Sequence, residues 1–309
     1  MSSSSNNSSA LAARPSLAVE TREILRAHGL RPRKELGQNF LIDRAVLDAV
    51  VAAADVRPGE TVLEIGPGIG TLTGELAARD AEVVAVELDE NLARVVQARA
   101  ALKRNVTVVR GNVLRLDLDE ALPADKPYKV VANIPYYITA PILRLFLESA
   151  RKPRSIVLMV QREVAERLAA PAGRLSILGV TAQFYARVEV VRVVPASAFM
   201  PPPEVDSALI RLRPYDTPPL PIDDPARFFT LVKAGFGEKR KQLHNALVHG
   251  LAHIPGARID AALAAAGIER TRRAETLSLA EWGTLYAELE PRLGKRPEMA
   301  ARTRMDRER

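Results

Sequence analysis

The chain has 309 residues, which is long enough for one large domain with a small one beside it. It contains no cysteine, which excludes disulfides, thiolate metal sites and cysteine nucleophiles, and its four histidines are too scattered to indicate zinc, so we expect no metal. Lys and Arg outnumber Asp and Glu by 44 to 37, and the net charge of +7 favours a polyanionic partner such as nucleic acid, although many soluble proteins are this basic without a functional reason.

The N-terminus is rich in Ser and Asn and lacks the basic start and apolar centre of a secretory signal. We therefore expect residues 1–19 to form a disordered tail. No later stretch has the roughly 20 consecutive apolar residues that cross a bilayer. These features predict a soluble, cytoplasmic protein.

Residues 20–213 alternate short β-branched runs with helical patterns, which predicts a doubly wound, Rossmann-like α/β domain. The expected parallel strands are 61–65, 82–87, 106–110, 129–132 and 155–161. The expected helices include 72–78, 91–102 and 141–148. Two further strands, 184–194 and 207–212, are joined by a proline-rich loop and should close one edge of the sheet as an antiparallel hairpin.

Five prolines between residues 214 and 225 rule out a continuous helix there and predict a linker. Residues 226–292 have helical patterning throughout, and we expect a small all-helical domain. Residues 293–309 mix basic and acidic side chains with almost nothing apolar, which predicts a disordered basic tail. Nothing in the pattern demands a second copy of the chain, so we expect a monomer.

A glycine-rich turn, residues 64–70, follows the first expected strand. Gly66 and Gly68 would let the backbone approach a ligand closely. Glu87 ends the next strand 21 residues after Gly66, where a carboxylate can accept hydrogen bonds from both hydroxyls of a ribose. Asn112, after the third strand, could bind an adenine edge, although a turn asparagine is an equal interpretation. Thr71 replaces the last glycine of the dinucleotide fingerprint, which disfavours NAD.

Residues 133–136 read Asn-Ile-Pro-Tyr and follow the fourth strand. The side-chain oxygen of Asn133 and the carbonyl of Ile134 could accept both hydrogens of a planar amine, with Pro135 fixing the backbone. Tyr136 could stack on the base, and Phe199 is a candidate for its opposite face, although Phe199 alone fits a core aromatic better. Combined with the glycine turn, this loop indicates methyl transfer to an amino group.

The series of motifs resembles the ribosomal RNA adenine N6-dimethyltransferases of the small subunit (KsgA/RsmA type). The resemblance extends over about residues 21–290. Besides the two motifs above, it includes the segments 36–43, 86–89, 161–167, 199–207 and 236–247. This resemblance implies a class I methyltransferase fold, S-adenosylmethionine as cofactor, and dimethylation of two adjacent adenosines near the 3′ end of 16S rRNA.

By the same resemblance, the cofactor is bound by Asn39, Leu41, Gly66, Gly68, Glu87, Asn112 and Asn133. The family usually has an aspartate in place of Asn112, which predicts weaker binding rather than loss of activity. Two basic clusters are expected to contact phosphates of RNA, unless each is only a solvated surface. They are Arg31, Arg33 and Lys34, and Lys239, Arg240 and Lys241.

Three alternatives remain open. The first is a relative that dimethylates one adenine of large-subunit RNA and gives antibiotic resistance, and the second is a ribosome assembly factor with weak or lost catalysis, which only Asn112 favours. The third is methylation of DNA amino groups, since a similar loop serves any planar amine. C5 methylation of pyrimidines is excluded by the missing cysteine.

Overall fold

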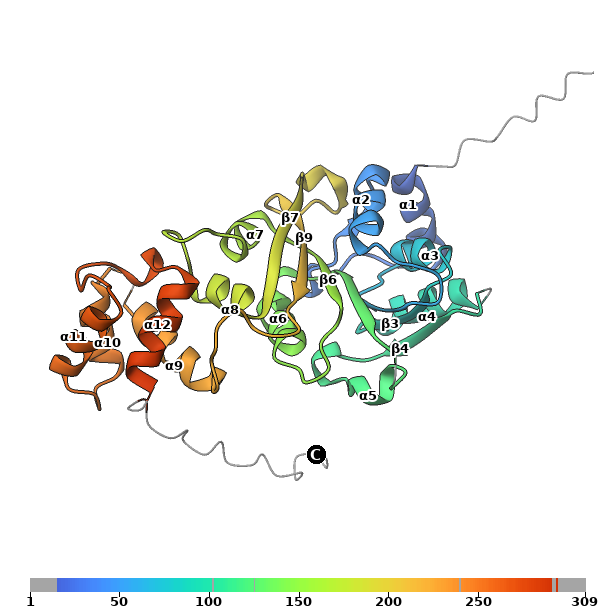
Figure 1. The fold of residues 1–309 in the computed structure, drawn as a ribbon. Coiled ribbons are helices and arrows are strands. Elements are labelled where there is room, and N and C mark those ends of the chain that lie inside the picture. The colour runs from blue at the N-terminus through green and yellow to red at the C-terminus, as the bar shows by residue number, and fades with distance from the viewer. Residues whose placement is uncertain (1–15, 102, 125, 239, 291–292, 294–309) are drawn as a thin grey trace, which may run out of the picture. The chain divides into compact units, whose positions relative to one another are not determined.

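The computed structural model describes residues 16–290 and 293 except 102, 125 and 239, and for Lys34 it describes only the backbone (Figure 1). The expected tails therefore lie largely outside the described residues. The chain divides into two compact units, one made of residues 1–126 and 194–206, the other of residues 127–193 and 207–309. Each is described by itself.

Three parallel strands form the sheet of the first unit, in the order β4-β3-β2. They are β2 (Thr61–Ile65), β3 (Glu82–Glu87) and β4 (Val106–Arg110). Val62 pairs with Val83, and Val84 pairs with Thr107. β2 is buried along its whole length, as the continuous apolar runs of a parallel sheet covered on both faces require. All three strands have the bounds that the sequence predicts.

Short helices surround these strands, and side-chain caps fix where several of them begin. They are α1 (Leu17–Ala27), η1 (Lys34–Leu36), α2 (Arg44–Ala54), α3 (Thr71–Ala77), α4 (Glu90–Ala100), η2 (Val113–Arg115), α5 (Leu118–Ala121) and η4 (Ala196–Ala198). Asp43 accepts the amide of Val46 at 3.1 Å and starts α2. α1 begins after the cap Ser16, so residues 17–19, which we expected in the tail, are helical.

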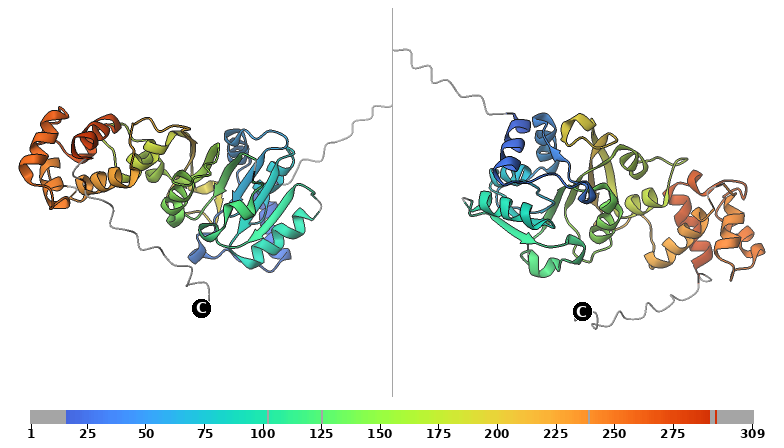
Figure 2. Two further views of the ribbon diagram at one scale, coloured as in Figure 1. Left: turned by 60° about the horizontal axis from the view of Figure 1, so that its bottom comes forward. Right: turned by 180° about the vertical axis from the view of Figure 1, so that it is seen from behind.

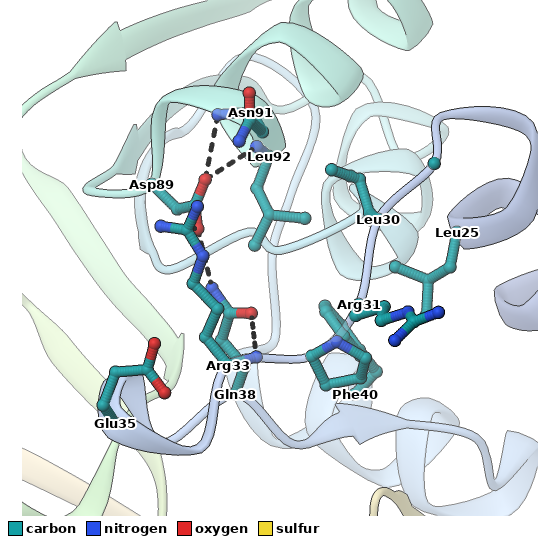
Figure 3. A pocket seen from close by; sticks show the side chains of 12 residues that line it. Leu25, Leu30, Arg31, Arg33, Glu35, Gln38, Phe40, Asp89, Asn91 and Leu92 are labelled. Atoms are coloured by element: carbon teal, nitrogen blue, oxygen red, sulfur yellow. Dashed lines mark hydrogen bonds and ion pairs between the residues drawn. The ribbon is translucent and has the colours of Figure 1, made fainter.

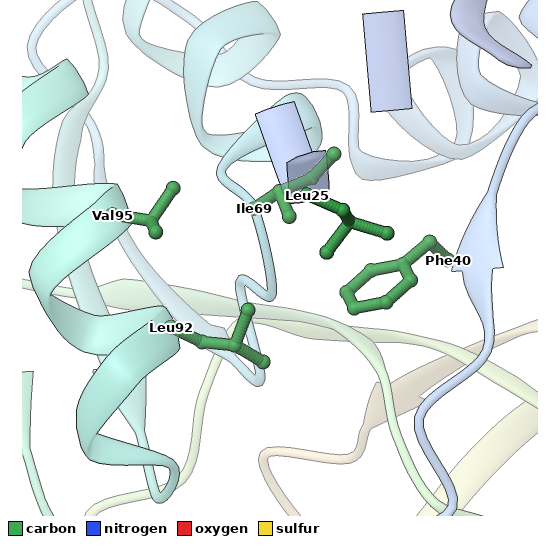
Figure 4. Packing of buried hydrophobic residues seen from close by; sticks show 5 residues of the cluster. All are labelled: Leu25, Phe40, Ile69, Leu92 and Val95. Atoms are coloured by element: carbon green, nitrogen blue, oxygen red, sulfur yellow. The ribbon is translucent and has the colours of Figure 1, made fainter. Parts of the chain in front are cut away.

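A two-stranded antiparallel sheet, absent from the sequence prediction, joins distant parts of the first unit. β1 (Phe40–Leu41) pairs with β8 (Phe199–Met200), with Phe40 opposite Met200 and Leu41 opposite Phe199. Phe40 then packs in a buried cluster with Leu25, Ile69, Leu92 and Val95, shown in Figure 4. Two-residue strands carry no periodicity, so only this packing defines them.

The second unit has four strands in the order β5-β6-β9-β7. They are β5 (Tyr128–Asn133), β6 (Ser155–Gln161), β7 (Ala186–Val194) and β9 (Ser207–Pro214). β5 and β6 are parallel, whereas β9 is antiparallel to β6 and β7 lies at the edge, which confirms the expected antiparallel closure. The predicted bounds were too short by one residue at each end of β5 and by two at the end of β9, and the start of β7 was wrong, because Phe184 and Tyr185 end helix α8.

The helices of the second unit include the expected all-helical region, drawn in orange and red in Figures 1 and 2. They are η3 (Tyr136–Ile138), α6 (Thr139–Leu147), α7 (Arg162–Leu168), α8 (Ile177–Tyr185), α9 (Pro225–Phe236), α10 (Leu243–Gly250), α11 (Gly256–Ala265), η5 (Ala274–Thr276) and α12 (Leu279–Leu289). Phe184 stacks on Phe228 with 5.1 Å between ring centroids, and Phe229 and Tyr286 join this cluster. The rings therefore attach α9 and α12 to α8, and this packing explains why Phe184 is helical. Among the described helices, none has the length and apolar character needed to span a membrane.

Candidate cofactor and substrate sites

The glycine turn between β2 and α3 requires glycine at three positions. Gly66, Gly68 and Gly70 have φ of 65°, 62° and 82°, the left-handed region that other residues rarely adopt. A Cβ at Gly68 would also lie 3.2 Å from Cε1 of Phe40. The amide of Gly66 donates to the carbonyl of Val86 at 2.9 Å, which joins the turn to the end of β3.

Glu87 ends β3 beside this turn, with a side chain that is 6% exposed. Its Oε2 accepts the amide of Gly68 at 3.1 Å, and its Oε1 accepts the amide of Asp89 at 2.9 Å. Burial raises the pKa of Glu87, and these two amides oppose the rise. Since each carboxylate oxygen has two lone pairs, both can accept one further hydrogen bond, as the two hydroxyls of a ribose would require.

Glu64 is a second buried carboxyl, which the sequence interpretation missed as a candidate site residue. It lies in β2, is 1% exposed, and its Oε2 has no hydrogen-bond partner among the described residues. Burial, with a smaller contribution from repulsion by Glu87, raises the pKa of Glu64 to about 8 against the opposing effect of Thr73. One signal was present, because Glu64 is the only charged residue of an otherwise uncharged strand.

Asn112 precedes η2 and caps it, with its Oδ1 accepting the amide of Leu114 at 3.0 Å. An amide side chain has one acceptor oxygen, so the acceptor expected to face an adenine already has a local partner. Two apolar side chains follow the strand ends here and remain accessible, Leu88 with 54% and Leu114 with 36% exposure. We had not singled out either leucine, although exposed leucines beside Glu87 and Asn112 suit the flat face of a base.

The remaining predicted cofactor residues of the first unit belong to the segment before α2. The Nδ2 of Asn39 donates to the carbonyl of Gly37 at 3.2 Å, and Leu41 lies in β1. Phe199 lies opposite Leu41 in β8 and is only 2% exposed, so its ring is packed rather than open to solvent. The core interpretation of Phe199 therefore describes its environment.

Asp89 connects this segment to Glu87, the carboxylate predicted to bind the cofactor. Its Oδ1 accepts the amides of Asn91 and Leu92 and caps α4, and its Oδ2 accepts Nε2 of Gln38 at 3.1 Å. Nη1 of Arg33 lies 3.4 Å from the same Oδ2. These groups border a pocket of about 370 Å³ that Arg31 also lines (Figure 3).

The predicted substrate loop, residues 133–136, belongs to the second unit and begins at the end of β5. Asn133 is the last residue of that strand, in register with Met159 of β6. Ile134 is 3% exposed, which anchors the loop in the core, and Pro135 has φ −56° and ψ 134° before η3. The backbone around the Ile134 carbonyl is thus fixed on one side by packing and on the other by the proline ring.

Tyr136 is held by a side chain 71 positions later in the chain. Its hydroxyl lies 2.6 Å from Oγ of Ser207, a fully buried residue at the start of β9, and its carbonyl accepts the hydroxyl of Thr139 at 3.0 Å. Burial raises the pKa of Tyr136, so the phenol is neutral at pH 7. Ser207 was within a recognised motif, but nothing in the sequence indicated its partner.

The predicted RNA-binding residues are divided between the units. Arg31 and Arg33 are exposed in the first unit, and the side chain of Lys34 lies outside the description. Arg240 and Lys241 are exposed between α9 and α10 in the second unit, and Lys239 is outside the described residues. Within the described chain, no cluster of three or more acidic or histidine side chains could hold a metal ion.

The sequence of the chain is similar to a known family and to known proteins. The family described as Ribosomal RNA adenine dimethylase matches residues 29–290. Ribosomal RNA small subunit methyltransferase A of Dehalococcoides mccartyi (strain CBDB1) is 44% identical over 278 residues, covering 90% of this chain and 95% of that protein. The protein of the same name from Geobacillus kaustophilus (strain HTA426) is 42% identical over 286 residues, covering 89% and 97%.

Two solved structures are also similar. The 23S rRNA methyltransferase ErmE has a TM-score of 0.66 and 32% identity, covering 82% of this chain and 100% of that one. A dimethyladenosine transferase from Plasmodium falciparum has a TM-score of 0.70 and 26% identity, covering 82% and 98%.

Proposed function

Because the chain belongs to the ribosomal RNA adenine dimethylase family and is a methyltransferase, we propose that it dimethylates two adjacent adenosines near the 3′ end of 16S rRNA. The modification would accompany maturation of the small ribosomal subunit. The observation that carries this choice is the 44% identity, over nearly full length, to a relative named for the small subunit. The 23S rRNA enzyme has 32% identity.

The residues of the first unit fit S-adenosylmethionine. Each oxygen of Glu87 has two lone pairs and could accept a ribose hydroxyl beside its backbone amide, and the left-handed glycines at 66 and 68 keep side chains away from the ligand. Asn112 with the exposed Leu88 and Leu114 would take the adenine, and Asn39 and Leu41 would complete the part of the site that this unit supplies. When bound, the cofactor supplies a methyl group on a sulfonium, an electrophile that needs no general base beforehand.

The loop after β5 would orient the substrate amine. The nitrogen lone pair of adenine N6 is delocalised into the ring and must turn toward the incoming methyl. Asn133 and the Ile134 carbonyl would accept the two amine hydrogens, which makes that orientation the favoured one. Positioning of this kind supplies most of the rate in such a reaction, and the proton leaves after transfer.

Tyr136 would stack on the flipped adenine. Stacking on an aromatic ring stabilises a base by about 1–3 kcal/mol, comparable to the few kcal/mol needed to remove it from its neighbours. The bond to Ser207 holds the phenol before substrate arrives, so little rotamer freedom is lost on binding. Phe199 would contact the other face only after moving from its packed position.

RNA contacts would come from the exposed arginines of the first unit, Arg31 and Arg33, and from Arg240 and Lys241 of the second, with Lys34 and Lys239 beside them. The partner is 16S rRNA in the small subunit or its precursor, bound by a monomer in the cytoplasm. Affinity carried by phosphate contacts must fall steeply with salt.

Two other functions have a specific observation in their favour. The similarity to ErmE supports a large-subunit adenine dimethyltransferase giving antibiotic resistance. The local hydrogen bond of Asn112, which takes one of the two lone pairs on its acceptor oxygen, supports a catalytically weak ribosome assembly factor.

The test is transfer of labelled methyl from S-adenosylmethionine to unmethylated small subunits, large subunits and DNA, with the wild type and Asn133→Ala. We expect dimethyladenosine in 16S rRNA from the wild type and none from Asn133→Ala, which must still bind small subunits. Label in 23S rRNA would select the resistance enzyme. Subunit binding without label on any substrate would select the assembly factor.

A further inference from the structure

Asp89 lies between Glu87, the proposed cofactor ligand, and Arg33, a proposed contact for RNA. On one side, its amide donates to Oε1 of Glu87 at 2.9 Å. On the other side, its Oδ2 accepts a hydrogen bond from Nε2 of Gln38 and forms an ion pair with Nη1 of Arg33. Asp89 is 6% exposed and also caps α4, so its carboxylate has little freedom to move.

Arg33 is supported from two directions. Its guanidinium contacts Asp89, and its backbone amide donates to Oε1 of Gln38 at 2.9 Å, so the three residues form a closed ring of contacts. The contact with Asp89 involves Nη1, and the side chain is 49% exposed. A guanidinium has five N–H donors in a rigid fork, and those not facing Asp89 can bind a phosphate.

The pocket beside this ring is also lined by an arginine and an acid that do not belong to the ring. Arg31 also lines it, but lies near Leu25 and Phe40, away from Asp89, as Figure 3 shows. Glu35 lines the same pocket and is exposed, and no described arginine of the first unit forms an ion pair with it. The pocket therefore holds one arginine and one acid inside the ring, and one of each outside it.

We propose that Asp89 is a positioning residue, which holds the Arg33 guanidinium ready for an RNA phosphate and links that contact to Glu87. The inference rests on the proposed function, because it takes Glu87 as a cofactor ligand and Arg33 as an RNA contact. An acid next to an RNA-binding surface ordinarily weakens RNA affinity by repelling phosphates. Here the gain from orienting Arg33 exceeds that repulsion, and RNA and cofactor strengthen each other's binding.

The test depends on the sign of an effect. Asp89→Asn removes one negative charge and keeps an oxygen to cap α4, but leaves an NH₂ group facing Arg33 and Gln38. Glu35→Gln removes the same charge from the same pocket outside the ring. Binding of unmethylated small subunits is measured at fixed salt. We expect Asp89→Asn to lower the affinity about fivefold or more, the lower end of ordinary coupling between sites, and Glu35→Gln to leave it unchanged or raise it.

A double-mutant cycle assigns the effect to Arg33. Arg33→Gln and Arg31→Gln should each weaken binding, but Asp89→Asn should cause no further loss in the Arg33→Gln background, where only its repulsion of phosphates is removed, and should keep its full loss in the Arg31→Gln background. S-adenosylhomocysteine should raise the subunit affinity of the wild type and have no such effect on Asp89→Asn. Thermal unfolding checks that each variant is folded.

The inference is overturned if Asp89→Asn raises subunit affinity as Glu35→Gln does, or if its effect is the same in both arginine backgrounds. Those results with a wild type that methylates small subunits leave the proposed function intact. A wild type that binds neither small subunits nor S-adenosylhomocysteine overturns both.

Discussion

The cofactor turn and the substrate loop are built by different means. The turn at residues 66–70 depends on backbone conformations that only glycine adopts readily, together with a hydrogen bond from the Gly68 amide to Glu87, 19 positions later in the chain. The substrate loop depends on Tyr136, which is held by Ser207 from a different strand. The first site is therefore specified mainly by local sequence, whereas the second needs the sheet of its unit to be complete.

The largest effect should come from the turn. Gly68→Ala places a Cβ 3.2 Å from the Phe40 ring at a φ of 62°, and such strain costs of order 1–3 kcal/mol. Relieving it would shift the amide whose hydrogen bond Glu87 accepts, so we expect S-adenosylhomocysteine affinity to fall by roughly 10- to 100-fold, since each 1.4 kcal/mol is a factor of about ten. Calorimetric titration measures this.

Gly74→Ala is the matched control, because Gly74 is inside α3 with open space for a Cβ. Alanine there should stabilise the protein by about 0.5–1 kcal/mol and leave cofactor binding unchanged. Equal loss in both variants would contradict a specific role for the turn.

The next effect is a pH dependence of stability caused by Glu64, the buried carboxyl just before the turn. Glu64 has a pKa of about 8 when folded, against an ordinary value of 4.5, so the unfolded chain releases this proton first as pH rises. The free energy of unfolding should therefore decrease between about pH 4.5 and 8, by at most about 1.4 kcal/mol per pH unit for one group. Glu64→Gln should remove most of this decrease, as urea unfolding at pH 5 and pH 8 will measure.

Part of the decrease should remain in Glu64→Gln, because the pKa of Glu87 is also raised by burial. Glu82→Gln is a suitable control, since Glu82 is an exposed acid at the start of β3. A wild type whose stability increases over this pH range would contradict the assignment.

A smaller effect is expected in the substrate loop. Tyr136→Phe keeps the aromatic ring but removes the bond to Ser207, and one such hydrogen bond contributes about 1 kcal/mol. We expect kcat to fall about five- to tenfold with S-adenosylhomocysteine affinity unchanged. Ser207→Ala should give the same loss, and the double variant no more than either single one, because all three lack the same bond.

Tyr137→Phe tests the specificity of that result. Tyr137 is adjacent but 63% exposed, so its hydroxyl should be dispensable. A loss equal to that of Tyr136→Phe would assign the effect to the loop sequence rather than to the bond with Ser207.

What could be predicted from sequence follows the same division. Strand bounds at β2, β3, β4 and β6 were correct because continuous β-branched runs define buried parallel strands locally. The predicted start of β7 was wrong because Phe184 packs against aromatic rings of α9, and no local sequence pattern indicates that contact. The sheet of β1 and β8 was missed for the same reason, since its two strands are far apart in the chain.

The candidate sites show this division at single residues. Gly66, Gly68 and Glu87 could be identified from their spacing, and in the structure the amides of both glycines donate hydrogen bonds to the end of β3, Gly66 to Val86 and Gly68 to Glu87. Ser207 and the ring of Asp89, Gln38 and Arg33 could not, because each depends on pairs more than 50 positions apart. Sequence spacing therefore predicts a site that backbone conformation builds, but not a site built from side chains that are far apart in the chain.

The smallest effect should come from Asn112, whose side chain caps η2 and is also proposed to contact the adenine. Its one oxygen caps η2 through Leu114, whereas an aspartate has a second oxygen for an adenine amino group. We expect Asn112→Asp to raise S-adenosylmethionine affinity about fivefold, the value of one hydrogen bond. Asn112→Ala should lower it, since the cap is lost and Leu114 is released. If Asn112→Asp instead weakens binding, the added charge does not serve the adenine, and the amide NH₂ of Asn112 is the group that contacts it.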